Sequence, residues 1–275
     1  MKHIKHYRVF EASAAAAPAP LTPEQIEWLN QCTKGTWKLN PQTGLVDVDG
    51  NFDCKEQGLA DFKGVRFGVV GGYFSCEDNL LTSLVGAPQE VRGYFSCGDN
   101  QLTSLVGAPQ KVEGDFDCHE NLLTSLVGAP QEVGRDFDCD NNRLTSLEGA
   151  PQDVGVSFDC DNNRLTSLVG APREVGGIFR CENNQLTSLE GAPQKVGVGR
   201  SFYCSDNPVS DETLESIFGI METGKGYLES VESLWPEIPV DDQALLYRPE
   251  FKWVGAEEAK KLQAVGRFNK IKGML

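Results

Sequence analysis

Histidine is scarce in this chain, and long apolar runs are missing. Only three histidines occur in 275 residues, His3, His6 and His119, so a histidine-centred catalytic triad has little material. No stretch approaches the roughly 20 apolar residues of a membrane-spanning helix. Residues 1–20 also lack the apolar core of a secretory signal peptide. We therefore expect a protein of a reducing, intracellular compartment, with free thiols.

Cysteine is abundant, and its spacing reveals a repeat. Nine cysteines are present without any C-x-x-C pair, and Cys32 alone stands outside the pattern. Six of the others follow one another at intervals of 21 residues, with one more 22 residues before and one 23 residues after them. Such a fixed period is typical of a solenoid, in which no single turn can bury its apolar face alone. The spacing predicts about eight turns, at Cys54, Cys76, Cys97, Cys118, Cys139, Cys160, Cys181 and Cys204.

Each repeat reads F-x-C-x-x-N-x-L-T-S-L-x-G-A-P-x-x-V. Phe and Cys alternate with polar residues, which predicts a short strand with both side chains pointing inward. Stacked turns then form a parallel sheet with strands about 4.8 Å apart. The Asn after each Cys offers its amide to backbone groups that leave the sheet, and Leu and Val complete the core. The inward Phe positions are Phe52, Phe74, Phe95, Phe116, Phe137, Phe158, Phe179 and Phe202.

This repeat resembles the leucine-rich repeat, whose unit carries L-x-x-L-x-L-x-x-N-x-L. Phe and Cys take the two strand positions before the Asn, and Leu follows it. The repeat motif is similar to repeats of short bacterial and tailed-phage proteins: it reads L-T-S-L-x-G-A-P and follows V-D-V-D-G-N-F-D-C at residues 46–54. The resemblance implies an α/β solenoid with a short parallel β-sheet on its concave face. The terminal turns depart from the pattern, with Gln57 in place of Asn and Val209 in place of Leu.

The chain divides into four predicted regions. Residues 1–20 are expected to be a flexible leader, because residues 12–20 are rich in Ala and Pro. Residues 21–50 are expected to be an N-terminal cap, with a helix that begins at Thr22 and Pro23 and a hairpin around residues 40–44. Residues 51–207 hold the repeats. Residues 208–275 are expected to form a helical C-terminal cap.

The regular cysteines admit two interpretations. They could form a metal or redox array, but no histidine recurs with them, and in-register parallel strands suit disulfides poorly. Alternatively, each Cys fills a small apolar site beside a bulky Phe. We favour the second interpretation and expect neither a metal nor a cofactor.

Function is expected on the outward-facing strand residues, because these vary while the core residues repeat. Along the chain they change from Tyr and Ser to a dense group of Asp and then to Arg. The predicted partner-binding residues are Tyr73, Tyr94, Asp115, Asp117, His119, Asp136, Asp138, Asp140, Asp159, Asp161 and Arg180.

The acidic centre of this surface has three open interpretations. A basic protein or peptide would relieve the repulsion between carboxylates about 5 Å apart. A solvated face, kept acidic for solubility and multiplied by repeat duplication, is the second. A Ca²⁺ site or mimicry of nucleic acid is the third, although the glycines of calcium loops are missing. The net charge of −15 argues against direct nucleic-acid binding and for basic partners.

These features predict a non-enzymatic protein–protein interaction module. An open face is expected to lack the desolvation that shifts the pKa of a catalytic carboxylate. The alternative is a structural or assembly component of a tailed-phage particle. Residues 1–11 resemble the basic–aromatic leaders that direct proteins into phage heads and are cleaved after Glu, here Glu11. The same segment also fits an ordinary amphipathic tail that docks on a partner. Either way, we expect the protein in a cytoplasm, that of the host if phage-encoded, or in a virion.

Overall fold

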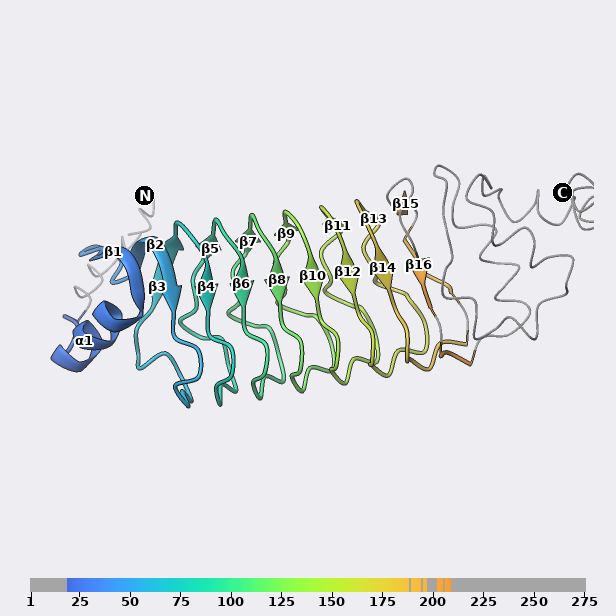
Figure 1. Ribbon diagram of the computed structural model, residues 1–275, viewed down its shortest axis with the longest axis horizontal. Helices are drawn as coiled ribbons and strands as arrows, with labels where there is room; N and C mark the ends of the chain where they lie inside the picture. Colours follow the sequence, from blue (N-terminus) through green and yellow to red (C-terminus); the bar gives the residue numbers. More distant parts are fainter. Residues whose placement is uncertain (1–18, 188, 194, 197–201, 205, 209–275) are drawn as a thin grey trace, which may run out of the picture.

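The chain winds into a parallel β-solenoid whose turns follow one another along one long axis (Figure 1). The structure is a computed structural model that describes residues 19–187, 189–193, 195–196, 202–204 and 206–208. The solenoid has about seven turns rather than eight, because the eight regular cysteines bound seven intervals. Most of the predicted leader, and the C-terminal cap beyond Pro208, lie outside the described residues.

Each turn contributes two short strands, so the solenoid contains two parallel ladders. The first ladder consists of the Phe strands β4 (Phe74–Ser75), β6 (Phe95–Ser96), β8 (Phe116–Asp117), β10 (Phe137–Asp138), β12 (Phe158–Asp159), β14 (Phe179–Arg180) and β16 (Phe202–Tyr203). The second consists of β3 (Phe67–Val70), β5 (Glu90–Val91), β7 (Lys111–Val112), β9 (Glu132–Val133), β11 (Asp153–Val154), β13 (Glu174–Val175) and β15 (Lys195–Val196). The longer strand β2 (Val46–Asp53) pairs with β3 and with β4, and so begins both ladders. The sequence pattern predicts the first ladder, but it places the Val positions in the core without assigning them a strand.

Helix is confined, in the part of the chain that the structure describes, to α1 (Pro23–Cys32). The α/β description therefore does not hold for the repeats, which contain strands and turns only. The return half of each turn carries Gly and Pro, which disfavour helix. In the first of these segments Gly86 has a φ of 98°, and the Ala87 N–H donates to the Leu84 carbonyl over 2.9 Å.

The N-terminal helix and hairpin cover the first turn. Helix α1 begins after Thr22 with Pro in its first turn, as the sequence predicts, and Gln25 completes a capping box with Thr22. Strand β1 (Thr33–Leu39) then pairs antiparallel with β2 across the predicted turn. Trp28 is buried with its ring centroid 5.3 Å from that of Phe52. This contact joins α1 to the end of the aromatic core.

A stack of Phe rings runs through the core of the solenoid. Neighbouring ring centroids from Phe52 to Phe202 lie 5.1 to 5.6 Å apart, with interplanar angles of 7° to 19°. Because the strands are only about 4.8 Å apart, the rings are offset along the stack, which is the favourable arrangement for aromatic pairs. The spine inferred from the sequence is therefore confirmed.

The cysteines fill the core beside this stack. All nine are free and buried. The thiols from Cys54 to Cys181 donate to carbonyls one turn away, as from the Cys118 Sγ to the Asp138 carbonyl over 3.2 Å. Burial raises the pKa of the Cys118 thiol well above its ordinary value, so it stays protonated and unreactive. These contacts agree with the interpretation of the cysteines as core residues.

The repeated asparagines are buried and tie each turn to the one before it. The Asn142 Nδ2 donates to the carbonyls of Cys118, Cys139 and Asp140 over 3.0, 3.2 and 3.0 Å. Its Oδ1 accepts from the Leu123 N–H over 3.0 Å. One side chain thus satisfies four backbone groups from two adjacent turns, which would otherwise be buried without partners.

Replacing Asn142 with Ala should destabilise the protein by roughly 2–5 kcal/mol, because several buried polar groups lose their partner at once. The exposed neighbour Arg143 is the control, and Arg143→Ala should change stability by less than about 0.5 kcal/mol. Urea unfolding followed by circular dichroism measures both. Equal stability of the two variants would contradict this role of the amide.

Candidate functional site

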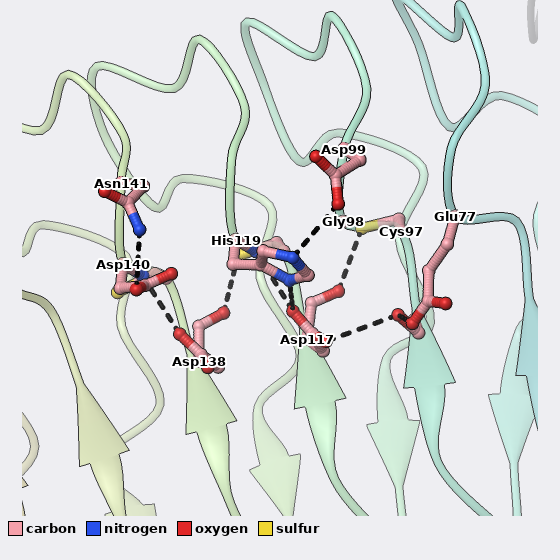
Figure 2. Close-up of polar contacts among 12 residues, drawn as sticks. Glu77, Cys97, Gly98, Asp99, Asp117, His119, Asp138, Asp140 and Asn141 are labelled. Atoms are coloured by element: carbon pink, nitrogen blue, oxygen red, sulfur yellow. Dashed lines mark hydrogen bonds and ion pairs between the residues drawn. The ribbon is translucent and has the colours of Figure 1, made fainter.

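Outward-facing carboxylates gather on one side of the first ladder. Asp117, Asp138 and Asp159 are adjacent partners in the parallel register of β8, β10 and β12. The next outward residues along each strand add His119, Asp140 and Asp161. We call this surface the acidic face; it consists of Asp117, His119, Asp138, Asp140, Asp159, Asp161, Arg180 and Glu182. Figure 2 shows its first half, where the side chains of neighbouring turns point toward one another.

His119 is held between two carboxylates from different turns (Figure 2). Its Nδ1 lies 2.6 Å from the Asp117 Oδ1, and its Nε2 lies 3.2 Å from the Asp99 Oδ2. The hydrogen bond with Asp117 is the main cause that raises the pKa of His119 to about 10, so the ring is a cation at neutral pH. Gly98 makes room for it, because a Cβ there would lie 2.3 Å from the His119 Cε1.

Asp99 is a contact residue that sequence reasoning missed. It lies in the bend after β6 with a φ of 51°, in the left-handed region. A sequence signal does exist, because the residue before each repeated Asn is always Asp, Glu or Asn, and Asn and Asp tolerate this conformation best. The equivalent positions with positive φ are Asp78, Glu120, Asn141, Asn162, Asn183 and Asp206.

Burial raises the pKa of the central carboxylates. The pKa reaches about 6 for Asp138, Asp140 and Asp159 and about 7 for Asp161. Loss of solvent is the first cause for each, and repulsion by neighbouring carboxylates adds to it. The expectation that an open face lacks desolvation is therefore wrong. Equivalent side chains one turn away on both sides shield each carboxylate from water.

Backbone N–H groups also hold these carboxylates in place. Asp138 accepts from the N–H of Asp140, and Asp159 accepts from the N–H of Asp161, each over 3.0 Å. The Asp161 Oδ1 in turn accepts from the N–H of Glu182 in the next turn. The acidic face is therefore an ordered row of oxygens rather than a set of loose surface side chains.

The chain supplies its own cations at both ends of the first ladder. The Lys34 Nζ lies 2.6 Å from the Asp53 Oδ2 and 2.8 Å from the Tyr73 hydroxyl. Arg180 lies 3.7 Å from Asp159 and 3.7 Å from Glu182, over the ring of Tyr203. Between these ends, no Lys or Arg of the described chain forms an ion pair with Asp138, Asp140 or Asp161. His119 is cationic and lowers the pKa of Asp138 and Asp140 from a distance, but its ring is already paired with Asp117 and Asp99.

The remaining predicted partner-binding residues contact residues of the adjacent turn. The rings of Tyr73 and Tyr94 stack with centroids 4.6 Å apart. Asp115 pairs with the Arg135 Nε over 3.1 Å, and Asp136 accepts from the Ser157 N–H over 2.8 Å. The structure thus brings the predicted residues onto one side of the ladder, in a continuous series of turns.

The outward serines of this ladder are less accessible than the sequence suggests. Ser75 and Ser96 are only 3% and 2% exposed. Ser96 donates a hydrogen bond to the Glu77 carboxylate of the preceding turn. Long neighbours therefore cover these short side chains, and the accessible surface at this end belongs to tyrosines and carboxylates.

A comparison with models of known protein families gives no match, and a comparison with curated proteins gives none either. No family follows from them. In the described residues, no group of three or more His, Cys, Asp or Glu side chains could hold a metal ion. No helix among those residues has the length and apolar character needed to cross a bilayer.

The raised carboxylate pKa values predict an inverted pH dependence of stability. The folded state binds protons at pH 6–7, whereas unfolded Asp binds them near its ordinary pKa of 3.8. This contribution to stability is therefore complete below about pH 4 and is lost as the pH rises through about 7. Asp138→Asn with Asp159→Asn keeps the acceptor oxygens but removes the charges. We expect this double variant to melt above the wild type at pH 8, to keep only part of that advantage at pH 5 and to lose it below about pH 4.

Differential scanning calorimetry at several pH values measures this difference. The control is Glu27→Gln with Glu148→Gln, two exposed positions away from the acidic face, whose advantage should not depend on pH. If acidification from pH 8 to 5 instead widened the advantage of the Asp138→Asn, Asp159→Asn variant, the raised pKa values would be contradicted.

Gly98→Ala tests how His119 is held. The added methyl group should push the ring away from Asp117 and Asp99, so the pKa of His119 should fall from about 10 toward its ordinary value of 6.5. Titration of the imidazole resonances by NMR measures the change, and a His119→Gln variant identifies the resonance. A wild-type His119 that titrates near 6.5 would show that the contact with Asp117 is absent in solution.

Proposed function

We propose that this protein is a non-enzymatic interaction module of the leucine-rich-repeat kind, which binds a basic protein partner through its acidic face. One observation carries the proposal. Asp138, Asp140 and Asp161 stand close together with raised pKa values, and no Lys or Arg of the described chain pairs with them. A partner that brings cations would lower the free energy of the ionised face.

The cations at the two ends of the ladder indicate how such a partner would be held. Lys34 contacts a carboxylate and lies 5.5 Å from the centre of the Tyr73 ring. Arg180 combines two carboxylates with the Tyr203 ring, 4.6 Å away. Carboxylates with flanking aromatic faces attract both ammonium and guanidinium groups. We infer that partner Lys or Arg side chains occupy the equivalent positions over the central turns.

The alternatives have less support. A face kept acidic for solubility does not need carboxylates that are ordered by backbone bonds and partly desolvated, because exposed charges serve that purpose. Calcium binding has no supporting ligand group among the described residues. A structural role in a tailed-phage particle rests on the resemblance of residues 1–11 and on the repeats. Location in a cytoplasm or a virion is part of the same proposal.

Capture from a lysate of the source cells tests the acidic face. The bait pair is the wild type and the Asp138→Asn, Asp159→Asn variant, with Glu27→Gln, Glu148→Gln as a control of equal charge. Mass spectrometry should find a basic protein retained by the wild type and the control but depleted at least about tenfold on the variant, and released by high salt because exposed ionic contacts are screened.

Binding to the purified partner should also weaken below about pH 6, as the central carboxylates become protonated. If every protein captured by the wild type is captured equally by the Asp138→Asn, Asp159→Asn variant, the acidic face is not the binding surface. A role in spacing or assembly would then be the better proposal.

A further inference from the structure

A groove of about 740 Å³ crosses the second ladder at β7, β9, β11 and β13. Its floor contains Gly134, Gly155 and Gly176, and its walls carry the residues before each Val of these strands. None of its lining residues belongs to the acidic face. The volume is within the roughly 300–1,000 Å³ of typical binding sites. The lining residues include Lys111, Glu113, Glu132, Asp153 and Glu174.

The groove lies where successive turns lack a side chain at one position. The residue after the Val is Arg92 and then Glu113 in two earlier repeats, but it is glycine in the next four, and the first three of these glycines line the groove. A Cβ on Gly155 would lie 2.0 Å from the Gly134 carbonyl oxygen, so close stacking excludes a side chain there. The surface is therefore lowered over the turns of Gly134, Gly155 and Gly176. Glu113 lies beside the first of them and pairs with Lys111 over 3.5 Å.

The walls of the groove are acidic. Glu132 and Asp153 are exposed, and neither forms an ion pair with another residue of the described chain. Lys111, the one cation among the lining residues, is already paired with Glu113. A ligand that fits this groove should carry positive charge, because the walls are acidic. It should also have an extended backbone, because the groove runs across strands rather than into the core.

We propose that the groove binds residues 1–10 of the chain itself. This segment carries Lys2, Lys5 and Arg8 and no acidic residue before Glu11, in a chain whose net charge is −15. Its charge is therefore complementary to the walls at Glu132 and Asp153. The proposal concerns a different surface from the acidic face, and it stands if that face binds nothing.

The connecting chain is long enough to cover the axial distance to the groove. Residues 11–18, fully extended, span at most about 28 Å. Along the stack, the near edge of the groove at β7 lies two strand spacings beyond β3, about 10 Å, and β13 lies five spacings beyond it, about 24 Å. The axial part of the path is therefore within the length of residues 11–18, and α1 starts beside the segment that leads into β3, where the Gln25 Nε2 donates to the Lys63 carbonyl over 2.8 Å.

A labelled peptide with the sequence of residues 1–11 tests the proposal by fluorescence anisotropy. The receptor is the full chain with Lys2→Gln, Lys5→Gln and Arg8→Gln, so that its own segment does not compete. A groove variant adds Glu132→Lys and Asp153→Lys, and a control of equal charge adds Glu27→Lys and Glu148→Lys. Melting temperatures verify that each variant folds.

We expect the peptide to bind the receptor and the control with affinities within about twofold of each other at moderate salt. It should bind the groove variant at least about tenfold more weakly, since two attractive contacts become repulsive. Adding Asp138→Asn and Asp159→Asn instead should leave peptide binding unchanged. Absence of binding, an equal loss in the groove variant and the control, or a loss caused only by the acidic-face substitutions would each overturn the proposal.

Discussion

In-register stacking, with each residue about 4.8 Å from its equivalent in the next turn, is the constraint on which the rest of this structure depends. Phe rings gain from an identical neighbour, and the thiols and Asn amides find backbone groups of an adjacent turn at hydrogen-bonding distance. Carboxylates do not gain, because equal charges come as close as the rings do. The rise in the pKa of Asp138 and Asp159 and the order of the core therefore have one geometric origin.

Stacking also explains which parts of the fold the sequence could predict. The Phe strands were predictable, because alternation at period two recurs in every repeat. The second ladder was not, because each repeat has one regular apolar residue there, the Val of strands such as Glu90–Val91, whereas Phe-x-Cys supplies two alternating ones. The desolvation of Asp138 was missed for another reason: it depends on how far the equivalent side chains of the adjacent turns extend beside it. Lys34 lies on the N-terminal strand β1 and Asp99 in a bend, so a comparison of equivalent strand residues from repeat to repeat does not reveal their contacts.

The acidic face illustrates the trade between stability and binding. A row of polar but uncharged residues, such as the paired Ser75 and Ser96 in the earlier turns, would stack there without repulsion between charges. Retaining carboxylates that repel one another lowers the stability of the folded state at neutral pH, and binding surfaces are where such local conflicts are expected. The cations Lys34 and Arg180 at the two ends confine the repulsion between carboxylates to the middle of the first ladder. The groove on the second ladder differs, because missing side chains rather than crowded ones define its surface.

The buried asparagines have a consequence for how such a chain can change in length. Asn142 satisfies groups of its own turn and of the turn before it, so every turn is completed by its successor. A whole additional repeat would bring its own amide and meet an identical neighbour on either side. The solenoid could thus grow or shrink in units of about 4.8 Å while each interior junction stayed the same, and the number of repeats becomes a ruler that sets the distance between its two ends.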